Sequence, residues 1–446
     1  MPTLPPTLSR NETLTLLTLS GACFAILANT FSGDGEPLIA SLALSGIAFS
    51  LCYSMIRWLG PTFVNHGFKG RDLCKPNRPE IPECMGAVCA VVYLIVIIVF
   101  IPFPFYKDIV AATSGGGNRD VVLEVQHVNE GRFLHRFPHS KLASYLSAII
   151  SLQTIALLGL GDDLFDIRWR HKWWIPGLAC IPILVVYFVD FGVTSIVIPI
   201  PLQPHLGELF DVGVLYYVYM ACVAMFCPQS INMLAGINGI EVSQSIVIAL
   251  LLVFNDCLYL FTPPTPTDLF SSASSLSGVS LLWLVSRRVR HLCFSGMVAV
   301  VVSSSLPLSP HPPALLLLLL WVFGLVPCPR HRLPKFNART GLLEPSVTTW
   351  DPENNVQPRA YVAPVLHLLA RFRLLKVTLD DKGRFLETSN FTLLNLWLVI
   401  RGPMREDRLA AEVTALQFVA GALGLFARHR LALLVFKEDN LGKTHR

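Results

Sequence analysis

Charged residues are scarce in this chain. They account for 15% of its 446 residues, whereas soluble globular proteins carry roughly a quarter. Hydrophobic residues reach 53%, and the mean hydropathy is +0.55. So few charges do not cover the surface of a large soluble enzyme, and the long uncharged runs place the protein in the membrane class. The same composition excludes an intrinsically disordered chain, a collagen-like chain and a coiled coil.

The chain also lacks a long tract of lysine and arginine, and it lacks any Cys-x-x-Cys pair. Its formal net charge is only +5, which gives nucleic-acid binding little support. The 11 cysteines are odd in number and lie mostly inside apolar runs. Because disulfide frameworks and zinc sites need ordered spacings, we interpret these cysteines as buried free thiols.

Apolar stretches recur along nearly the whole chain, and most reach or approach the roughly 20 residues that a helix needs to cross a bilayer. They lie at residues 12–17, 37–57, 86–105, 142–161, 175–191, 212–228, 240–261, 276–286, 293–306, 313–328 and 410–436. This pattern predicts an all-α polytopic membrane protein with about ten transmembrane helices. A small cytosolic α/β insertion is expected before the last helix, where the alternating residues 374–390 predict a β-hairpin around an Asp-Asp-Lys-Gly turn.

These runs divide the chain into segments. The expected segments are an N-terminal extension with room for an extra membrane segment (1–36), a membrane core (37–328, atypical at 270–321), a cytosolic insertion (329–409), the last transmembrane helix (410–436) and a C-terminal tail (437–446).

The charge of the connecting loops predicts their side of the membrane. Lysine and arginine gather in residues 57–83, 162–172, 287–290 and 329–408, whereas 191–211, 262–275 and 307–312 contain neither. The positive-inside rule therefore assigns the basic loops to the cytosol. Residues 106–141, whose basic residues include Lys107, Arg119, Arg132 and Arg136, run against this rule.

The densest polar motif is GLGDDLFDIRWRHKWW, at residues 159–174. Three carboxylates, on Asp162, Asp163 and Asp166, are followed closely by basic side chains. Acids at a membrane boundary usually bind an ion or move protons, and neighbouring cations neutralise phosphate oxygens. The alternative interpretation is a solvated loop whose acids and bases pair with one another.

Amide side chains interrupt the apolar motif CPQSINMLAGINGIE, at residues 227–241. Gln229, Asn232 and Asn238 offer donors and acceptors that coordinate a hard cation or bind a base edge. The alternative is a polar break between two membrane helices, stabilised by capping.

Two basic loops complete the set. In PCPRHRLPKFN (327–337), two arginines flank His331 directly after an apolar run, and arginine suits bidentate phosphate contacts. A positive-inside anchor is the alternative. The loop GRDLCKPNRPEIPECMG (70–86) places Asp72, Glu83 and several cations before another apolar run, as a ligand-binding loop requires.

These motifs resemble a known enzyme family. GRDLCKP…PECMG, GLGDDLFDIRWRHK, INMLAGINGIE and PCPRHRLPKFN, with FIPFPFYK and LYYVYM, are similar to the eukaryotic UDP-N-acetylglucosamine–dolichyl-phosphate N-acetylglucosaminephosphotransferases, within the polyprenyl-phosphate N-acetylhexosamine-1-phosphate transferase superfamily. The resemblance covers residues 37–260 and continues from 322 to near the end.

The resemblance implies a polytopic enzyme of the endoplasmic reticulum membrane with its active site facing the cytosol. Such an enzyme transfers N-acetylglucosamine 1-phosphate from UDP-N-acetylglucosamine to dolichyl phosphate, releases UMP and uses Mg²⁺, as the first step of the lipid-linked oligosaccharide pathway for protein N-glycosylation. A homodimer and an association with the next glycosyltransferase of the pathway are further implications.

By motif position, the resemblance also implies roles for individual residues. Asp162 and Asp163 would be the catalytic acid pair, acting as a base or organising charge, and Asn232 would be a magnesium ligand. The uridine part of the donor would contact Arg71, Asp72, Leu73, Glu83 and Asn238. Its sugar and phosphates would contact Arg330, His331 and Arg332. The lipid phosphate would be held by Lys172, Met225, Phe226, Cys227, Pro228, Gln229, Ser230, Ile231, Asn232 and Met233.

One expected residue is missing. The family's second magnesium ligand is an aspartate in a Val-Gly-Asp-Thr setting, but the corresponding residues 278–302 lack it, and no Asp or Glu occurs between Asp268 and Glu344. A gene-model error, an inactive paralogue and a replacement ligand are three explanations. Since magnesium usually needs one or two carboxylates, we expect this chain to be inactive or poorly folded, and a form with the Gly-Asp-Thr loop to be active.

Two functions of other classes remain as alternatives. The first is an inactive or regulatory membrane protein of the same fold. The second is a secondary transporter, which intramembrane polar residues always suggest. The absence of an internal repeat and the position of the charges at loop edges argue against a transporter.

Overall fold

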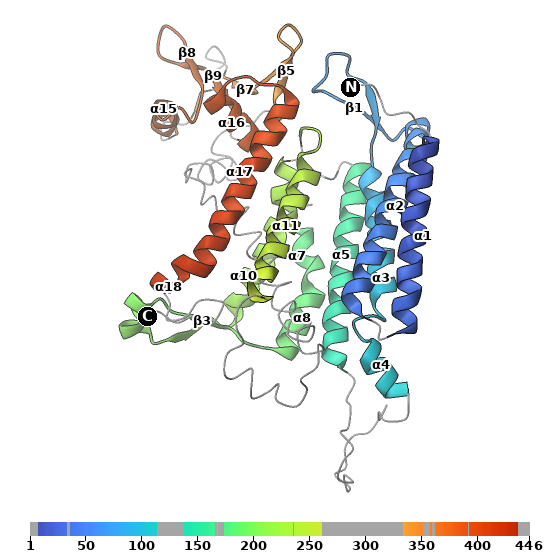
Figure 1. The fold of residues 1–446 in the computed structure, drawn as a ribbon. Coiled ribbons are helices and arrows are strands. Elements are labelled where there is room, and N and C mark those ends of the chain that lie inside the picture. Colours follow the sequence, from blue (N-terminus) through green and yellow to red (C-terminus); the bar gives the residue numbers. More distant parts are fainter. Residues whose placement is uncertain are drawn as a thin grey trace. The chain divides into compact units, whose positions relative to one another are not determined.

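The computed structural model describes residues 8–33, 36–113, 138–165, 167, 174–234, 236–260, 333–350, 357–358, 362–390 and 392–435. Most of this structure is helical (Figure 1). Four helices are long and apolar enough to cross a membrane, at Arg10–Ser32, Pro37–Asn65, His139–Phe165 and Glu406–Leu431. Shorter apolar helices span Met85–Phe100, Ile175–Asp190, Val214–Phe226 and Ile240–Asn255. The expectation of a helical membrane protein is confirmed, whereas the expected runs at 276–286, 293–306 and 313–328 lie outside the described residues.

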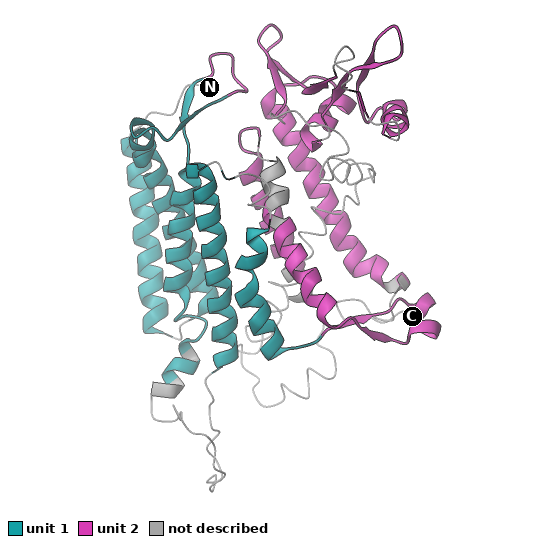
Figure 2. Ribbon diagram, turned by 180° about the vertical axis from the view of Figure 1, so that it is seen from behind, with its two compact units in different colours: residues 1–72, 79–193 teal, residues 73–78, 194–446 magenta. Residues whose placement is uncertain are grey.

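Two compact units make up the described chain, and Figure 2 colours them separately. Unit 1 contains residues 1–72 and 79–193, and unit 2 contains residues 73–78 and 194–446. The elements of unit 1 are α1 (Arg10–Ser32), α2 (Pro37–Asn65), β1 (Lys69–Arg71), β2 (Glu80–Pro82), α3 (Met85–Phe100), α4 (Tyr106–Thr113), α5 (His139–Phe165), α7 (Ile175–Ala179) and α8 (Ile181–Asp190).

The helices of unit 1 pack through small residues and a few polar contacts. Ala40 and Ala43 of α2 are buried, and a Cβ added at Gly46 would meet the Cys23 sulfur of α1 at 2.5 Å. This close approach is the packing mode of membrane helices, where small residues let backbones meet. The Tyr145 hydroxyl of α5 donates to the Ile97 carbonyl of α3 at 2.8 Å. In the direction of the chain, α2 and α5 end, and α3 begins, at the same end of the unit (Figure 1).

Unit 2 combines membrane helices with small sheets. Its elements are β3 (Ser195–Val197), η1 (Ile200–Leu202), α9 (Gln203–Leu206), β4 (Leu209–Asp211), α10 (Val214–Leu234), α11 (Ile240–Leu260), β5 (Lys335–Asn337), β6 (Leu342–Glu344), β7 (Val347–Thr349), α15 (Ala363–Arg371), β8 (Val377–Leu379), β9 (Phe385–Ser389), α16 (Leu393–Arg401), α17 (Glu406–Phe426), the π-helical turn η2 (Ala427–Leu431) and α18 (Ala432–Val435).

The strands of unit 2 are short and antiparallel. β3 pairs with β4, β5 pairs with β6, and β7, β9 and β8 form a sheet in that order. The hairpin expected at residues 374–390 is confirmed, because β8 pairs with β9 and the Gly383 amide donates to the Asp380 carbonyl at 2.8 Å. Gly383 has φ +73°, a conformation that glycine adopts without strain.

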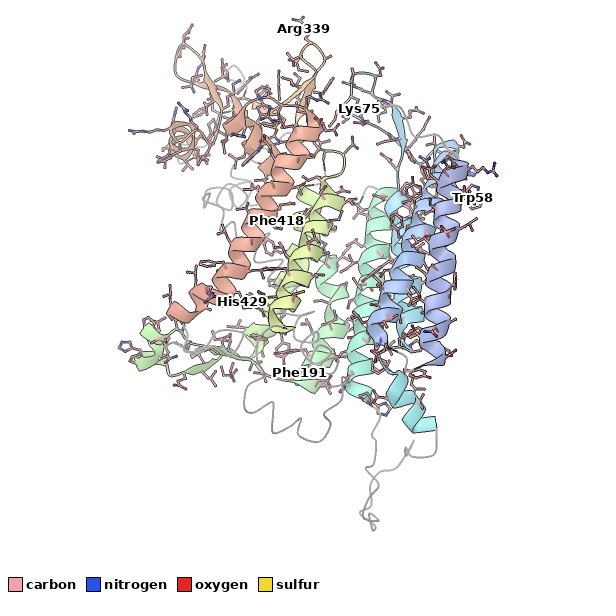
Figure 3. The ribbon with its side chains drawn as sticks, viewed as in Figure 1. Trp58, Lys75, Phe191, Arg339, Phe418 and His429 are labelled. Carbon is pink, nitrogen blue, oxygen red and sulfur yellow. The ribbon has the colours of Figure 1, made fainter. Side chains whose placement is uncertain are left out.

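Parallel helices α11 and α17 hold unit 2 together. A Cβ added at Gly421 of α17 would lie 2.2 Å from Leu251 of α11, so the two helices touch at the glycine. Further along, His429 Nε2 and Asn255 Oδ1 lie 2.9 Å apart, and both side chains are buried. The outward faces of the membrane helices carry large apolar side chains such as Trp58 and Phe418, labelled in Figure 3, at 74% and 48% exposure. Such surfaces suit lipid and not water.

Candidate functional site

An acid pair lies near the end of helix α5 in unit 1. Asp162 and Asp163 lie in the last turn of α5, where Asp162 is half-buried and Asp163 is exposed. Carboxylates at a helix C-terminus are unfavourable, because they meet the negative end of the helix dipole. Helix stability therefore gives no reason for this pair.

Cys84 connects this pair to a second predicted motif. It precedes α3 and is 8% exposed, and its thiol is hydrogen-bonded to the Asp163 carboxylate. Burial raises the pKa of the Cys84 thiol, and the charges of Asp163 and Glu83 raise that pKa further. The thiol therefore stays protonated and donates. The structure thus brings Glu83 and Asp163 close to one thiol.

The β1–β2 hairpin arranges the rest of that motif. Arg71 lies opposite Glu80, and Asp72, which is 5% exposed, donates its backbone amide to the Pro79 carbonyl at 3.1 Å. Glu83 folds over Gly70 so closely that a Cβ there would lie 2.0 Å from Glu83 Oε1. A side chain at position 70 would displace this carboxylate. Arg71, Asp72 and Glu83 therefore share one hairpin.

The chain then turns abruptly into α3. Cys84 adopts a left-handed conformation with φ +62°, which a side chain with a Cβ rarely takes. The Ala87 amide closes the turn by donating to the Cys84 carbonyl at 3.1 Å. Strained backbone of this kind often marks a functional site.

Unit 2 carries the amide motif on the loop between α10 and α11. The Asn238 backbone amide and its side-chain Nδ2 both donate to Glu406 Oε1, at 2.9 and 2.8 Å. Glu406 is the first residue of α17, where the helix dipole stabilises a carboxylate.

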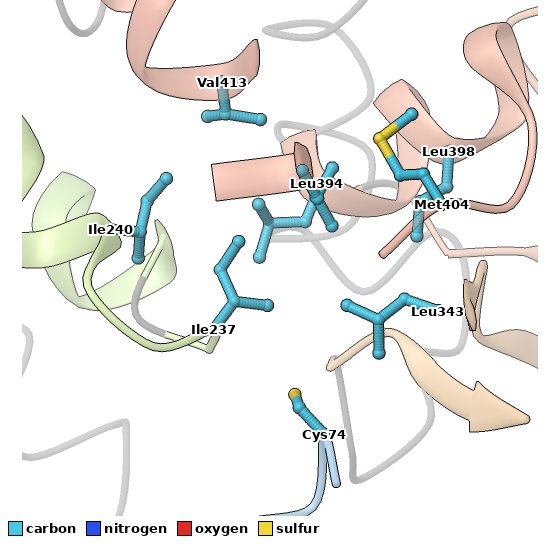
Figure 4. Packing of buried hydrophobic residues seen from close by; sticks show 9 residues of the cluster. Cys74, Ile237, Ile240, Leu343, Leu394, Leu398, Met404 and Val413 are labelled. Carbon is cyan, nitrogen blue, oxygen red and sulfur yellow. The ribbon is translucent and has the colours of Figure 1, made fainter. Parts of the chain in front are cut away.

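Buried apolar residues fix the position of this loop. Ile237 and Ile240 are 6% and 0% exposed and pack in a cluster with Leu343, Leu394 and Val413 (Figure 4). A Cβ added at Gly236 would lie 2.3 Å from Leu333, so the loop backbone lies directly against its neighbours. Asn238 is therefore an exposed polar residue on a fixed backbone.

The other predicted residues have these positions. Leu73 is 45% exposed and belongs to unit 2, and Met225 and Phe226 lie on α10, where Phe226 is exposed. Pro228 is a half-buried residue within α10. The side chains of Cys227, Gln229, Ser230, Ile231, Asn232 and Met233 lie outside the described residues, as do Lys172, Arg330, His331 and Arg332.

Sequence reasoning missed two residues of these sites. Cys84 follows the predicted Glu83 directly in the sequence, but a cysteine in the loop before an apolar run gives no sign of a bond to Asp163. Glu406 lies 168 residues from Asn238. Its place at the start of an apolar helix is explained by capping alone, so no local signal points to the amide.

Comparison with known proteins gives a consistent family. The model of glycosyl transferase family 4 matches residues 145–302. The UDP-N-acetylglucosamine–dolichyl-phosphate N-acetylglucosaminephosphotransferase of Saccharomyces cerevisiae is 44% identical over 431 residues, which cover 91% of this chain and 94% of the yeast protein. The Schizosaccharomyces pombe protein of that name is 41% identical over 93% of this chain and 97% of its own length, and the Dictyostelium discoideum one is 30% identical over 85% and 86%.

Proposed function

The chain belongs to the family of UDP-N-acetylglucosamine–dolichyl-phosphate N-acetylglucosaminephosphotransferases, and from this premise we propose its reaction and the residues that perform it. The enzyme transfers N-acetylglucosamine 1-phosphate from UDP-N-acetylglucosamine to dolichyl phosphate. The products are N-acetylglucosaminyl-diphosphodolichol and UMP, and the reaction is the first step of the lipid-linked oligosaccharide pathway for protein N-glycosylation.

The observation that carries the assignment of the active site is the contact of Cys84 with Asp163, which joins the acid pair of α5 to the loop of Glu83. These two motifs lie far apart in the sequence. A solvated loop whose acids pair with its own basic residues would not require contact between them. This contact favours a chemical role for the acids over the alternative of a solvated loop.

The bond changes in the transfer are simple. A phosphate oxygen of dolichyl phosphate forms a bond to the phosphorus that carries the sugar. The bond from that phosphorus to the bridging oxygen of UMP breaks, and its electron pair leaves with UMP. The protein must hold the two phosphates in line and offset the charge that both bring. Asp162 and Asp163 either take a proton from the acceptor phosphate or organise the cations around it.

The donor and acceptor are assigned to the residues that the family resemblance names. Arg71, Asp72, Leu73, Glu83 and Asn238 bind the uridine part, and Glu406 fixes Asn238. Arg330, His331 and Arg332 bind the sugar and its phosphates. Lys172 and residues 225–233 bind the phosphate of the lipid.

Magnesium fits the chemistry of this site. Carboxylate and amide oxygens are the hard ligands that Mg²⁺ prefers, and the charges of Asp163 and Glu83 that both act on Cys84 show negative charge gathered there. Asn232 on α10 would supply an amide oxygen. When bound, the ion would offset the charge of the pyrophosphate.

The proposal includes an orientation and an assembly. The loops of 57–83, 162–172 and 329–408 face the cytosol, in a membrane core of about ten spans. The membrane is that of the endoplasmic reticulum, and residues 329–409 form an insertion before the last helix. A homodimer and contact with the next glycosyltransferase of the pathway belong to the same proposal.

The experiment measures UMP release and lipid-linked sugar formation in microsomes supplied with UDP-N-acetylglucosamine and dolichyl phosphate. The chain as written is compared with a form that carries the family's Gly-Asp-Thr loop. Mg²⁺-dependent product from the second form supports the proposal. If that form folds and gives no product, the alternatives of a regulatory protein or a transporter replace it.

A further inference from the structure

Helix α15 carries an apolar stripe on its outer face. Phe372 and Leu368 are 67% and 54% exposed, more than any other large hydrophobic side chain among the described residues of 333–404. Pro364, four residues before Leu368, is exposed as well, so the three follow one helix face. The opposite face of α15 packs inside the protein, because Leu366 and Leu369 are buried against Trp350 and Phe385. Packing among the described residues therefore does not account for the outer stripe.

Basic residues lie in the last turn of α15 and directly after it. Arg371, Arg373 and Lys376 are all exposed. No Asp or Glu occurs from Val362 to Leu379. The nearest following acid, Asp380, is 3.3 Å from Arg384 in an ion pair. The positive charge beside the stripe is therefore not offset from within its own segment.

Arg373 occupies a position that normally belongs to glycine. Its φ is +57°, and it ends α15 with two backbone bonds, from the Arg373 amide to the Ala370 carbonyl and from the Leu374 amide to the Leu369 carbonyl, both at 3.0 Å. This pattern is the Schellman motif, whose left-handed residue is usually glycine. An arginine there is strained. Helix stability alone therefore does not explain an arginine at this position.

The part of unit 2 that carries α15 is fixed to a membrane helix. Leu343 and Met404 pair through their backbones, and both pack in one cluster with Leu409 and Val413 of α17. Since α17 is long and apolar enough to cross the membrane, its first turns mark where the chain enters the bilayer. Helix α15 packs on Phe385 of β9, and β9 contacts α16, whose Leu394 and Leu398 belong to that cluster, so packed elements connect α15 to the start of α17.

We propose that the exposed surface at the end of α15 docks on anionic lipid headgroups at the membrane surface that α17 enters. This surface is formed by Leu368 and Arg371 of the helix and by Phe372, Arg373 and Lys376, which follow it. The two apolar side chains lie at the boundary of headgroups and acyl chains, and the basic ones contact lipid phosphates. A basic amphipathic helix is the usual form of such an anchor. A protein partner is disfavoured, because two apolar side chains fall well short of a stable protein interface.

The test measures hydrogen–deuterium exchange of residues 363–376 in the full-length protein. The protein is placed in nanodiscs of phosphatidylcholine alone or of phosphatidylcholine with phosphatidylinositol. Slower exchange in the anionic discs, reversed by high salt, is expected. Arg371→Glu with Arg373→Glu should abolish the difference, since each basic residue near an anionic surface strengthens binding by about fivefold.

Two further variants separate lipid contact from folding. Arg373→Gly removes the strain, so its melting temperature should equal or exceed that of the parent while its protection by anionic lipid falls. Arg339→Glu with Lys382→Glu removes the same charge from exposed positions elsewhere in unit 2 and should leave the protection intact. Equal exchange in both kinds of disc, or equal loss in this control, would overturn the proposal and leave a protein partner as the explanation. No transferase assay is involved, so this outcome is independent of the proposed reaction.

Discussion

Asn238 gives both its backbone amide and its side-chain amide to a single oxygen of Glu406, 168 residues later in the chain. The bond joins the loop before α11 to the first turn of α17. Because the Asn238 side chain donates its Nδ2 to Glu406, its Oδ1 is oriented by the same contact. If Asn238 binds the uridine of the donor, Glu406 is the residue that positions it.

Glu406→Ala should therefore raise the KM for UDP-N-acetylglucosamine. Hydrogen bonds to a charged group contribute about 1.5–3 kcal/mol, so an increase of about tenfold or more is expected, with a smaller change in kcat. The neighbouring Asp407, which is paired with Arg405 at 3.1 Å, supplies the control Asp407→Ala. Equal KM values in both variants would exclude the positioning role.

Asp162→Asn and Asp163→Asn should each lower kcat severely in a form that carries the Gly-Asp-Thr loop. Positioned acids and bases contribute about 10²–10⁴-fold, so a loss of at least about 100-fold is expected. Asp190→Asn, at the end of α8, is the matched control in the same unit. Normal turnover in both active-site variants would return the motif to the interpretation of a solvated loop.

Gly421→Val should destabilise the pair of α11 and α17. The Cβ would lie 2.2 Å from Leu251, and overpacking of this kind costs about 1–3 kcal/mol. Thermal unfolding of the protein in detergent measures the loss, and Leu251→Ala in the same chain should recover part of it. Gly21 has no atom within 4 Å of an added Cβ, so a melting point of Gly21→Ala that falls as far as that of Gly421→Val would contradict this packing.

Acid should loosen the β3–β4 hairpin. The Thr194 hydroxyl and the Gly213 amide donate to Asp211, and these bonds lower the pKa of the Asp211 carboxyl from 3.8. A carboxyl with a depressed pKa in the folded state stabilises that state above its unfolded pKa, and the stabilisation is lost as the pH falls through the folded value. Hydrogen exchange of residues 195–213 should speed up relative to α10 below about pH 4. Asp211→Asn should abolish this dependence, and an unchanged dependence would assign it to another group.

Much of the membrane architecture could be predicted from the sequence. Hydropathy placed a membrane run at 142–161, inside α5, and strand alternation placed the hairpin of β8 and β9. Both signals are local, because a helix or a two-stranded hairpin forms between residues close in the chain. The low share of charged residues likewise predicted the class of membrane proteins, because composition does not depend on tertiary contacts.

The same local sequence signals do not predict contacts between residues that are far apart in the chain. The Asn238–Glu406 pair joins residues far apart in the sequence, and each has a sufficient local explanation, as a loop amide and as an N-terminal helix acid. Cys84 was classed with the buried thiols, and it is buried, but its bond to Asp163 depends on a left-handed turn that no residue pattern announces. Arg373 is similar, since an arginine predicts neither a Schellman ending nor a positive φ.

The most direct test of the account is the Mg²⁺-dependent formation of N-acetylglucosaminyl-diphosphodolichol, with UMP released in equal amount, by two forms of the protein. The form with the family's Gly-Asp-Thr loop restored should make both products and stop when Mg²⁺ is chelated. The chain as written, which lacks an acid between Asp268 and Glu344, should make little or none. Absence of product from the folded, loop-restored form would contradict the assignment as a transferase, and equal robust activity from the chain as written would show that the missing aspartate is dispensable.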